Sequence, residues 1–305
     1  MALAGILPAN ADLNPSNRTP ALPAVSVVVP CFNDGRFIDP LMASLAQQTF
    51  RDFEIIIVDD GSTDDITARK LAELEGRTRV IRQANRGASA ARNTGIRAAR
   101  AEIVVMIDCD DTVESTFLAE TVPALQGAPE DVGMVIAYLR LIGAESGVVP
   151  RYFNGFDLLF TNTLSTGLVL RKASWLAAGG YDETMRDGYE DWDFSLRLMG
   201  AGFRGIEIPK PLYIYHVAKD NQSSSISSGV HAKRLYAKLW REIRGRHAQD
   251  YRPLAMAHRW WVTRDGTGRI PLWKGLMGYA LALALPDSLF NRLFVRLHRR
   301  RMPQS

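Results

Sequence analysis

Short apolar runs alternate with helical patterns through the first hundred residues of the chain. The run Val25–Val29 precedes a polar loop and helical spacing from Phe37 to Gln48, and the run Phe53–Val58 precedes an Asp-rich loop and another helical pattern. Continuous apolar runs are typical of strands that are buried on both faces of a parallel sheet. The pattern therefore predicts strands at 25–29, 53–58, 80–81 and 103–107, and helices at 37–48, 66–75 and 88–99.

Weaker signals of the same kind continue to about residue 220. The pattern predicts a pair of strands within 132–141, a strand at 166–171, and helices at 174–178 and 187–199 that glycines close. Strands that alternate with helices favour parallel pairing and right-handed crossovers. We therefore expect one α/β domain over residues 24–220, with ligands at the carboxyl ends of its strands.

The charge of the chain changes sign near residue 220. Residues 221–305 carry 16 Lys/Arg against 4 Asp/Glu, a net charge of +12, whereas residues 1–220 have a net charge of −8. This region has helical spacing at 231–246, an apolar stretch at 272–285 and an amphipathic pattern at 288–301. The apolar stretch is shorter than the about 20 residues that cross a bilayer as a helix. We expect a helical, basic, amphipathic extension over 221–305 whose apolar face either lies on an anionic membrane through residues 270–301 or packs on the protein itself.

The composition is that of a globular protein, with 47% hydrophobic and 23% charged residues in 305. The two cysteines, Cys31 and Cys109, each adjoin a polar cluster, so we expect free thiols in a reducing compartment. Residues 1–23 lack an early basic region and a long apolar core, which predicts a disordered tail rather than a secretory signal. The expected location is the cytoplasm, with the protein peripheral on the inner face of the cell membrane if the extension binds lipid.

Three carboxylates follow the apolar run that ends at Ile107: Asp108, Asp110 and Asp111. Alternation along a strand places Asp108 and Asp110 on one side, and Asp111 enters the following turn. Hard divalent cations such as Mg²⁺ and Mn²⁺ prefer carboxylate and phosphate oxygens, so this cluster is a candidate site for a metal diphosphate. The same acids also fit a solvated strand end that leads into a capped helix.

Further polar loops fall at the same predicted edge of the sheet: residues 30–33, 59–64, 85–87 and 91–93. A bound nucleotide needs an apolar face beside its base, an acceptor for a ring N–H and a cation for its phosphates. Phe32, Asp60 and the cluster at 108–111 can supply these in turn.

Residues 25 to about 220 resemble a family 2 glycosyltransferase of the GT-A fold, a mixed, mainly parallel sheet flanked by helices. Five segments carry the resemblance in order: Val-Ser-Val-Val-Val-Pro-Cys-Phe-Asn at 25–33, Ser-Leu-Ala-Gln-Gln-Thr-Phe at 44–50, Ile-Ile-Ile-Val-Asp-Asp-Gly-Ser-Thr-Asp at 55–64, Asn-Arg-Gly-Ala-Ser-Ala-Ala-Arg-Asn at 85–93 and Ile-Asp-Cys-Asp-Asp at 107–111. Any one of them is a weak signal, but five with this spacing are specific.

The resemblance implies a nucleotide-sugar donor, with a UDP-sugar favoured, and a divalent metal, Mn²⁺ or Mg²⁺. The implied donor-binding residues are Pro30, Phe32, Asn33, Asp60, Arg92, Asp108 and Asp110. The implied metal ligands are Asp110, Asp111 and His216. His216 follows Tyr215 before a Ser-rich loop, and it also fits an ordinary residue at the end of a strand.

The same resemblance implies inverting transfer, which requires a base opposite the leaving diphosphate. The segment Tyr189–Phe194 resembles the acceptor-side motif of the family, which makes Asp191 the base, with Glu190 and Trp192 on the acceptor side. A carboxylate can serve because the attack acidifies the acceptor hydroxyl in the transition state. The implied reaction transfers a sugar to a glycan or lipid-linked acceptor in cell-surface polysaccharide biosynthesis.

Two other function classes share some of these features. A sugar nucleotidyltransferase has the same architecture, but it normally carries a Gly-rich loop with Arg and Lys after the first strand, and residues 30–35 lack those residues. A non-catalytic nucleotide-sugar-binding or membrane scaffold would not need every acid of the chemistry. No nucleic-acid partner is expected, because aliphatic residues interrupt the basic pattern of the C-terminal region.

Overall fold

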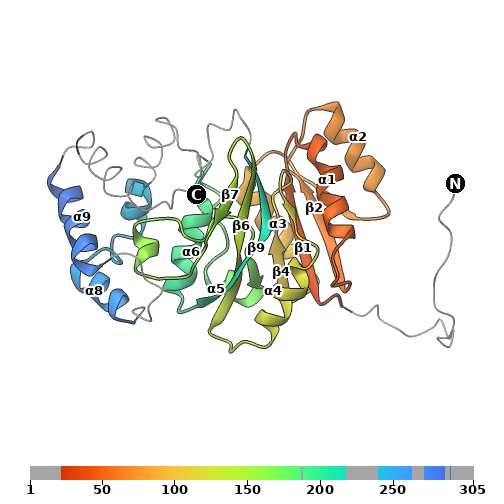
Figure 1. Cartoon of the computed structure of the whole chain (residues 1–305). Helices are drawn as coiled ribbons and strands as arrows, with labels where there is room; N and C mark the ends of the chain where they lie inside the picture. Colours follow the sequence, from red (N-terminus) through yellow and green to blue (C-terminus); the bar gives the residue numbers. More distant parts are fainter. Residues whose placement is uncertain (1–21, 187, 218–239, 263–270, 286–288, 290–305) are drawn as a thin grey trace.

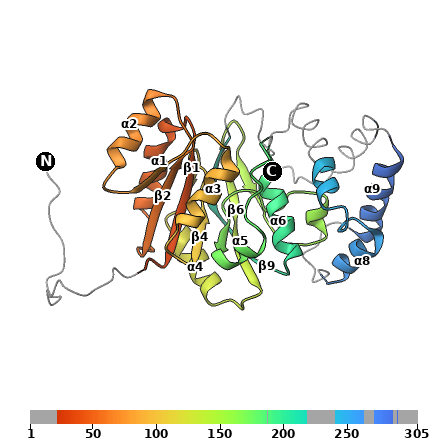
Figure 2. The same ribbon diagram turned by 180° about the vertical axis from the view of Figure 1, so that it is seen from behind.

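The computed structural model describes residues 22–186, 188–217, 240–262, 271–285 and 289 (Figure 1). Most of the predicted tail at 1–23, of the amphipathic segment at 288–301 and of the predicted helix at 231–246 lies outside the described residues. The described part contains one sheet that runs through the middle of the molecule, with helices on both of its faces (Figures 1 and 2).

The first four strands form the parallel half of the sheet, in the order β3-β2-β1-β4. Helices connect them in the predicted βαβ pattern, and the observed bounds differ from the predicted ones by one or two residues. The strands are β1 (Val25–Cys31), β2 (Phe53–Asp59), β3 (Arg79–Arg82) and β4 (Ile103–Met106), and the helices are α1 (Gly35–Ala46), α2 (Asp65–Leu74) and α3 (Ala88–Ala98).

Pro30 lies inside β1 rather than ending it, which corrects the predicted boundary at Val29. It pairs with Val58 of β2, whereas the pairing of β1 with β4 ends at Val28. The missing N–H of the proline is therefore tolerated, since it stands past the last rung shared with β4.

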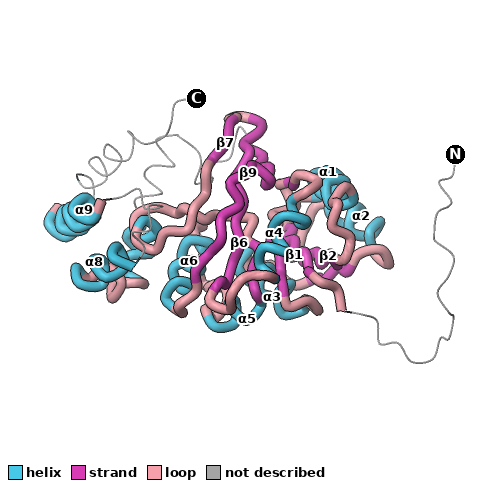
Figure 3. The backbone as a smooth tube through the Cα atoms, turned by 60° about the horizontal axis from the view of Figure 1, so that its bottom comes forward, coloured by secondary structure: helices cyan, strands magenta, loops and turns pink. Residues whose placement is uncertain are grey.

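The other half of the sheet is mixed. Strand β8 is antiparallel to β4 and β6, whereas β6 and β9 run parallel and side by side over most of their length (Figure 3). The segment predicted as two strands within 132–141 is one long strand that forms a hairpin with β7. The elements are β5 (Thr112–Val113), α4 (Phe117–Gln126), β6 (Val132–Gly143), β7 (Gly147–Val149), the 3₁₀ turn η1 (Asp157–Leu159), β8 (Val169–Arg171), α5 (Lys172–Ala177), α6 (Glu190–Gly200) and β9 (Arg204–Val217).

Left-handed backbone explains why two elements begin later than predicted. Gly167 has a φ of +72°, and the strand predicted from residue 166 begins at Val169. Gly188 and Tyr189 have φ values of +97° and +63°, and the helix predicted from residue 187 begins at Glu190. Positive φ interrupts both regular strand and regular helix.

Alternation along the central strands divides the apolar core between the two faces of the sheet. Val27 and Val29 of β1 face a core with Leu41 of α1, whereas Val28 faces the core that contains Ile96 of α3 and Trp192 of α6. Helices α8 (Pro253–Val262) and α9 (Leu272–Ala284) lie beyond α6, at the end of the molecule opposite α1 and α2 (Figure 2). In the part of the chain that the structure describes, no helix has the length and apolarity to span a membrane.

A glycine lets α3 approach the sheet closely. A Cβ atom on Gly95 would stand 2.3 Å from Cγ1 of Val28 and 3.2 Å from Cγ2 of Val58. Both valines belong to the central strands, whose backbones cannot move without breaking the ladder. The position of α3, and of the side chains at its start, therefore depends on Gly95.

We predict that Gly95→Ala lowers the free energy of unfolding by about 1–3 kcal/mol through overpacking. Gly200→Ala, in the last turn of α6 with no atom near its Cβ position, is the matched control and should cost nothing or stabilise slightly. Urea denaturation of both variants measures the difference. Equal midpoints for the two variants would contradict the packing argument.

Candidate functional site

The loops after β1 and β2 are joined through Asn33. Its side-chain Oδ1 accepts a hydrogen bond from the backbone N–H of Thr63 at 2.8 Å, and its own N–H donates to Oγ of Ser62 at 3.0 Å. Asn33 has a φ of +58°, a conformation that asparagine tolerates better than most residues. The neighbouring Phe32 stays 44% exposed at the edge of the sheet, where an apolar face for a base is expected.

Asp60 holds the loop that leads into α3. Its carboxylate accepts hydrogen bonds from Nε2 of Gln83 at 2.7 Å and from the backbone N–H groups of Arg86 at 3.0 Å and Gly87 at 2.7 Å. A carboxylate offers about four acceptor positions, so one remains for a ring N–H of a base. The sequence predicted only that ligand role, whereas the side chain also fixes residues 83–87.

Arg92 joins the two halves of the site. From the first turns of α3 its guanidinium contacts Oδ1 of Asp108 at 2.7 Å and Oε1 of Glu190 at 2.5 Å, and the side chain is nearly buried. Burial opposes the charged form of Arg92, but the two carboxylates raise its pKa well above the ordinary value. Arg92, predicted to bind the donor, thus forms an ion triad with Asp108 from the predicted donor half and Glu190 from the predicted acceptor half.

Both oxygens of Asp108 are occupied by protein groups. Besides Arg92, the hydroxyl of Thr166 donates to Oδ2 at 2.7 Å. Burial disfavours the ionised carboxyl, but Arg92 and Thr166 lower its pKa below the ordinary value. Asp108 is therefore an anion that is held in place between α3 and the segment before β8.

Asp111, a predicted metal ligand, is bonded to two groups of β9. It is 1% exposed, and its carboxylate accepts hydrogen bonds from the hydroxyl of Tyr213 at 2.9 Å and the backbone N–H of His216 at 3.0 Å. Burial, together with Asp110 and Asp108, raises its pKa well above the ordinary value. Its oxygens hold β9 against the strand end and are not directed to a ligand.

Asp110 and His216 are the side chains that fit a divalent cation. Burial, Asp108 and Asp34 raise the pKa of Asp110 to about 6, and Arg92 offsets only part of this shift. Nδ1 of His216 is buried and has no hydrogen-bond partner in the described part of the chain. Burial lowers the pKa of this imidazole, which favours the neutral form that binds metals.

The protein alone offers too few ligands for a closed metal site. Within the described ranges, no group of three or more His, Cys, Asp or Glu side chains is placed to hold a metal ion. A cation bound by Asp110 and His216 would take its remaining ligands from a diphosphate and water, as Mg²⁺ often does at phosphate sites. Asp110 and His216 would therefore bind a metal ion together with the diphosphate of a nucleotide rather than alone.

The two cysteines face each other beneath this edge. They are free and buried, with 3.7 Å between the two Sγ atoms, as expected of thiols in the core. The hydrogen bond to Cys31 and burial raise the pKa of the Cys109 thiol, which makes it an unreactive packing group.

Asp191 lies at the start of α6, on the other side of the triad. Oδ1 accepts a hydrogen bond from the N–H of Trp192 at 2.8 Å, and Oδ2 accepts one from Nδ2 of Asn162 at 3.0 Å. Burial and Glu190 raise the pKa of Asp191 to about 6, although Arg92 opposes this shift. Asn162 was missed from the sequence because its loop between β7 and β8 carries no recognisable motif.

Trp192, predicted to lie on the acceptor side, is buried directly after Asp191. Its side chain is 0% exposed, and Nε1 donates to the carbonyl of Leu158 at 2.6 Å. The indole packs α6 onto the 3₁₀ turn η1. Its contribution to the site is to hold Glu190 and Asp191 in position.

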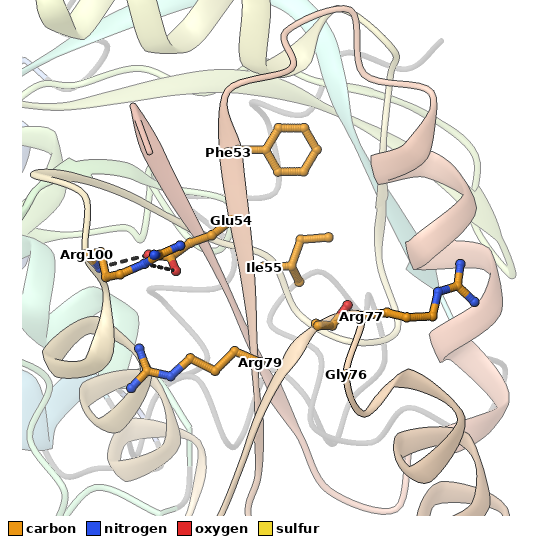
Figure 4. Close-up of a pocket in the computed structure, with 8 residues that line it drawn as sticks. Phe53, Glu54, Ile55, Gly76, Arg77, Arg79 and Arg100 are labelled. Carbon is orange, nitrogen blue, oxygen red and sulfur yellow. Dashed lines mark hydrogen bonds and ion pairs between the residues drawn. The ribbon is translucent and has the colours of Figure 1, made fainter. Parts of the chain in front are cut away.

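A surface cavity of about 650 Å³ lies elsewhere (Figure 4). It is lined by residues at the start of β2, among them Phe53 and Glu54, and by the arginines Arg77, Arg79 and Arg100. Arg100 turns toward Glu54 and contacts it at 2.8 Å. Because β2 carries Asp59 and Asp60 at its other end, this cavity is separate from the candidate site.

The chain matches one family model and several curated proteins. The model described as glycosyl transferase family 2 matches residues 26–158. EpsJ of Bacillus subtilis, described as an uncharacterized glycosyltransferase, is 46% identical over 98 residues, which cover 32% of this chain and 28% of that protein. Chondroitin synthase of Escherichia coli is 28% identical over 192 residues, which cover 59% of this chain and 27% of that protein. The matches to these two proteins thus span less than a third of each relative.

Solved structures share the fold across most of the chain. TarS 1-349 of S. aureus aligns with a TM-score of 0.58 at 18% identity, covering 92% of this chain and 93% of that one. The mannosyltransferase PcManGT of Pyrobaculum calidifontis, in complex with GDP-Man and Mn²⁺, aligns with a TM-score of 0.55 at 22% identity, covering 90% and 85%. These likenesses confirm the predicted GT-A fold.

We predict that Arg92→Met destabilises the protein by about 3–5 kcal/mol, since it leaves Asp108 and Glu190 buried without their cation. Glu190→Gln in the same background should recover part of the loss by removing one unpaired charge. Arg97→Met, an exposed position on the same helix, is the control and should change the free energy of unfolding by less than about 0.5 kcal/mol. Denaturant unfolding gives all three values, and a mild effect at Arg92 would refute the triad's structural importance.

Proposed function

We propose that this chain, whose residues 26–158 match the model of glycosyl transferase family 2, is an inverting, metal-dependent enzyme that transfers a sugar from a nucleotide-sugar to a hydroxyl group. The observation that carries the proposal is the ion triad of Asp108, Arg92 and Glu190. It brings the predicted donor-side acids and the predicted base to one edge of one sheet. An attacking hydroxyl and a leaving diphosphate need this proximity.

The donor half of the site is the set of loops at the ends of β1, β2 and β4. Phe32 offers an apolar face to the base, and Asp60 offers its remaining acceptor position to a ring N–H. Solved structures of the same fold contain UDP-GlcNAc or GDP-Man with Mn²⁺, which supports a nucleotide-sugar as the donor. We favour a UDP-sugar.

Asp110 and His216 are the residues that would hold the metal ion. A divalent cation bound there supplies positive charge to the diphosphate as it leaves. Asp108 is not among the metal ligands that we propose, since its oxygens already bind Arg92 and Thr166 and its part is to hold the two halves of the site together. Asp111 keeps His216 in place through the hydrogen bond to its backbone N–H.

The acceptor half is the start of α6. Asp191 accepts the proton of the acceptor hydroxyl while the oxygen forms its bond to the anomeric carbon and the bond to the diphosphate breaks. Asn162 holds the carboxylate in orientation, and Glu190 keeps its pKa high enough for it to receive a proton. Attack from the face opposite the diphosphate inverts the anomeric centre.

The acceptor is proposed to be a glycan or lipid-linked chain in cell-surface polysaccharide synthesis, at the inner face of the membrane. One curated relative is a chondroitin synthase, which supports a polysaccharide product. Trp261 of α8 and Trp273 of α9 are 57% and 60% exposed, and Lys274 lies against the ring of Trp273. Exposed indoles beside basic groups are typical of helices that rest in a membrane interface.

Asp191→Asn should reduce transfer by at least about 100-fold while donor binding stays within about twofold, because the amide cannot accept the proton. Release of UDP or GDP from a panel of nucleotide-sugars identifies the donor, and calorimetry then measures its affinity for both proteins. Asp65→Asn, exposed in the first turn of α2, is the matched control.

The pH dependence of kcat/KM is a second measurement of the role of Asp191. Since the deprotonated carboxylate is the active form, kcat/KM should rise with pH and reach half its maximum near the pKa of Asp191, about 6. Glu190→Gln removes a neighbouring negative charge and should move that midpoint to lower pH. A flat profile, or full activity in Asp191→Asn, would remove Asp191 from the role of base.

Asp110→Asn and His216→Ala should each weaken the binding of Mn²⁺ in the presence of the nucleotide by about tenfold or more, by the loss of a ligand. Electron paramagnetic resonance of the free Mn²⁺ measures this without requiring activity. Glu114→Gln, an exposed acid that pairs with Arg140, should bind Mn²⁺ like the unmodified protein. Unchanged binding in both site variants would place the metal elsewhere.

The protein should float with liposomes that contain anionic phospholipid, and less with neutral phosphatidylcholine, since basic groups accompany the exposed indoles. Trp273→Ala with Met277→Ala should reduce the bound fraction at least about twofold through the loss of inserted apolar area. Leu176→Ala, 70% exposed on α5, is the control. Failure of the unmodified protein to float would overturn membrane binding and leave the transferase proposal standing.

A further inference from the structure

Arg151 is a buried cation without a visible partner. It follows β7 in the segment 150–166, its side chain is 2% exposed, and it is among the largest fully buried side chains of the described residues. Within the part of the chain that the structure describes, Nε, Nη1 and Nη2 make no hydrogen bond. A guanidinium carries five N–H donors, and burial with none of them satisfied is strongly unfavourable.

The guanidinium of Arg151 is charged at neutral pH despite its burial. Burial lowers the pKa of Arg151 to about 10, while the nearby Tyr213 and Asp191 favour the charged form. Neither of them bonds to it: the hydroxyl of Tyr213 is engaged with Asp111 and Thr166, and the carboxylate of Asp191 with Asn162. An anionic ligand that paired with the guanidinium would remove this unfavourable free energy.

Arg151 belongs to the segment that holds acids of both halves of the site. The groups that favour its charged form are Tyr213, which bonds to Asp111 and Thr166, and then Asp191, the proposed base. The same segment supplies Asn162, which holds Asp191, and Thr166, which holds Asp108. Thr163 of this segment also has a buried hydroxyl with no hydrogen-bond partner among the described residues.

We propose that Arg151 binds an oxyanion of the acceptor, a phosphate ester or a carboxylate, beside the hydroxyl that Asp191 deprotonates. The proposal rests on the proposed function and adds that the acceptor is anionic. Arginine suits this task because its planar fork matches both phosphate and carboxylate with paired hydrogen bonds. An acceptor without such a group would leave the guanidinium unsatisfied and would bind more weakly.

The test measures melting temperatures of the full chain with two simple oxyanions, inorganic phosphate and glucuronate. Saturating Mn²⁺ with UDP or GDP, whichever raises the melting temperature, first fills the donor site. One of the two anions should then raise the melting temperature of the unmodified protein by about 2–4 °C, and the identity of that anion distinguishes a phosphate ester from a carboxylate.

Three variants test whether the rise in melting temperature depends on Arg151 rather than on another cation. Arg151→Met should abolish the anion response and should melt at the same or a higher temperature without anion, since it removes an unpaired charge. Arg151→Lys should keep part of the response, which preserves the test if the methionine variant does not fold. Arg140→Met, at a cation whose side chain is about half exposed on β6, should respond to the anion as fully as the unmodified protein.

Three results would overturn the proposal: no response of the unmodified protein to either anion, an undiminished response in Arg151→Met, or a response that disappears once the nucleotide is bound. The last would assign the anion to the donor's diphosphate. Nucleotide release from sugar donors is measured separately, so a failure of the transferase proposal is distinguishable from a failure of the anion site.

Discussion

The candidate site depends on one buried cation, Arg92, that holds an acid from each side. Asp108 ends the apolar run after β4, and Glu190 begins α6, so the guanidinium fixes the distance between two elements that the chain separates widely. Burying three charges is favourable only while all contacts are made. The ion triad can be completed only if α3 lies against the sheet, and the close approach at Gly95 permits that position. The close packing of α3 at Gly95 therefore helps to set the position of Arg92 at the edge of the sheet.

Several side chains that have the chemistry of ligands also build the site. Asn33 and Asp60 hold the loops after β1 and β2, and Asp111 holds β9. Buried carboxylates and amides need their hydrogen bonds satisfied within the protein, and loops at a strand edge expose many backbone N–H groups that can satisfy them. Such bonds do not exclude a ligand, because a carboxylate has about four acceptor positions, and Asp60 and Asp191 each keep some of theirs. Nδ1 of His216, in contrast, has no hydrogen-bond partner among the described residues.

The parallel half of the sheet could be predicted because β1, β2 and β4 are continuous apolar runs and helices alternate with the strands from β1 to β4. The mixed half could not. Strand β9 contains Pro209 and Pro211, which argue against a strand, yet both lie where the register with β6 shifts, so no ladder bond is lost. The contacts of the site could not be predicted from local sequence patterns either, since Arg92 and Glu190 are 98 residues apart and Asn162 belongs to no motif. Sequence pattern identified the acids, but only the fold shows which of their oxygens are engaged.

Asp110 and Asp191 have the same elevated pKa, about 6, and both are raised first by burial. Neighbouring acids raise both values further, Asp108 and Asp34 for Asp110 and Glu190 for Asp191, and Arg92 offsets part of the shift in each case. The two carboxyls therefore differ in their neighbours rather than in their pKa. Under the proposed function a divalent cation bound to Asp110 would add positive charge there and keep that carboxylate ionised, whereas Asp191, beside Glu190, would keep an affinity for the proton of the acceptor.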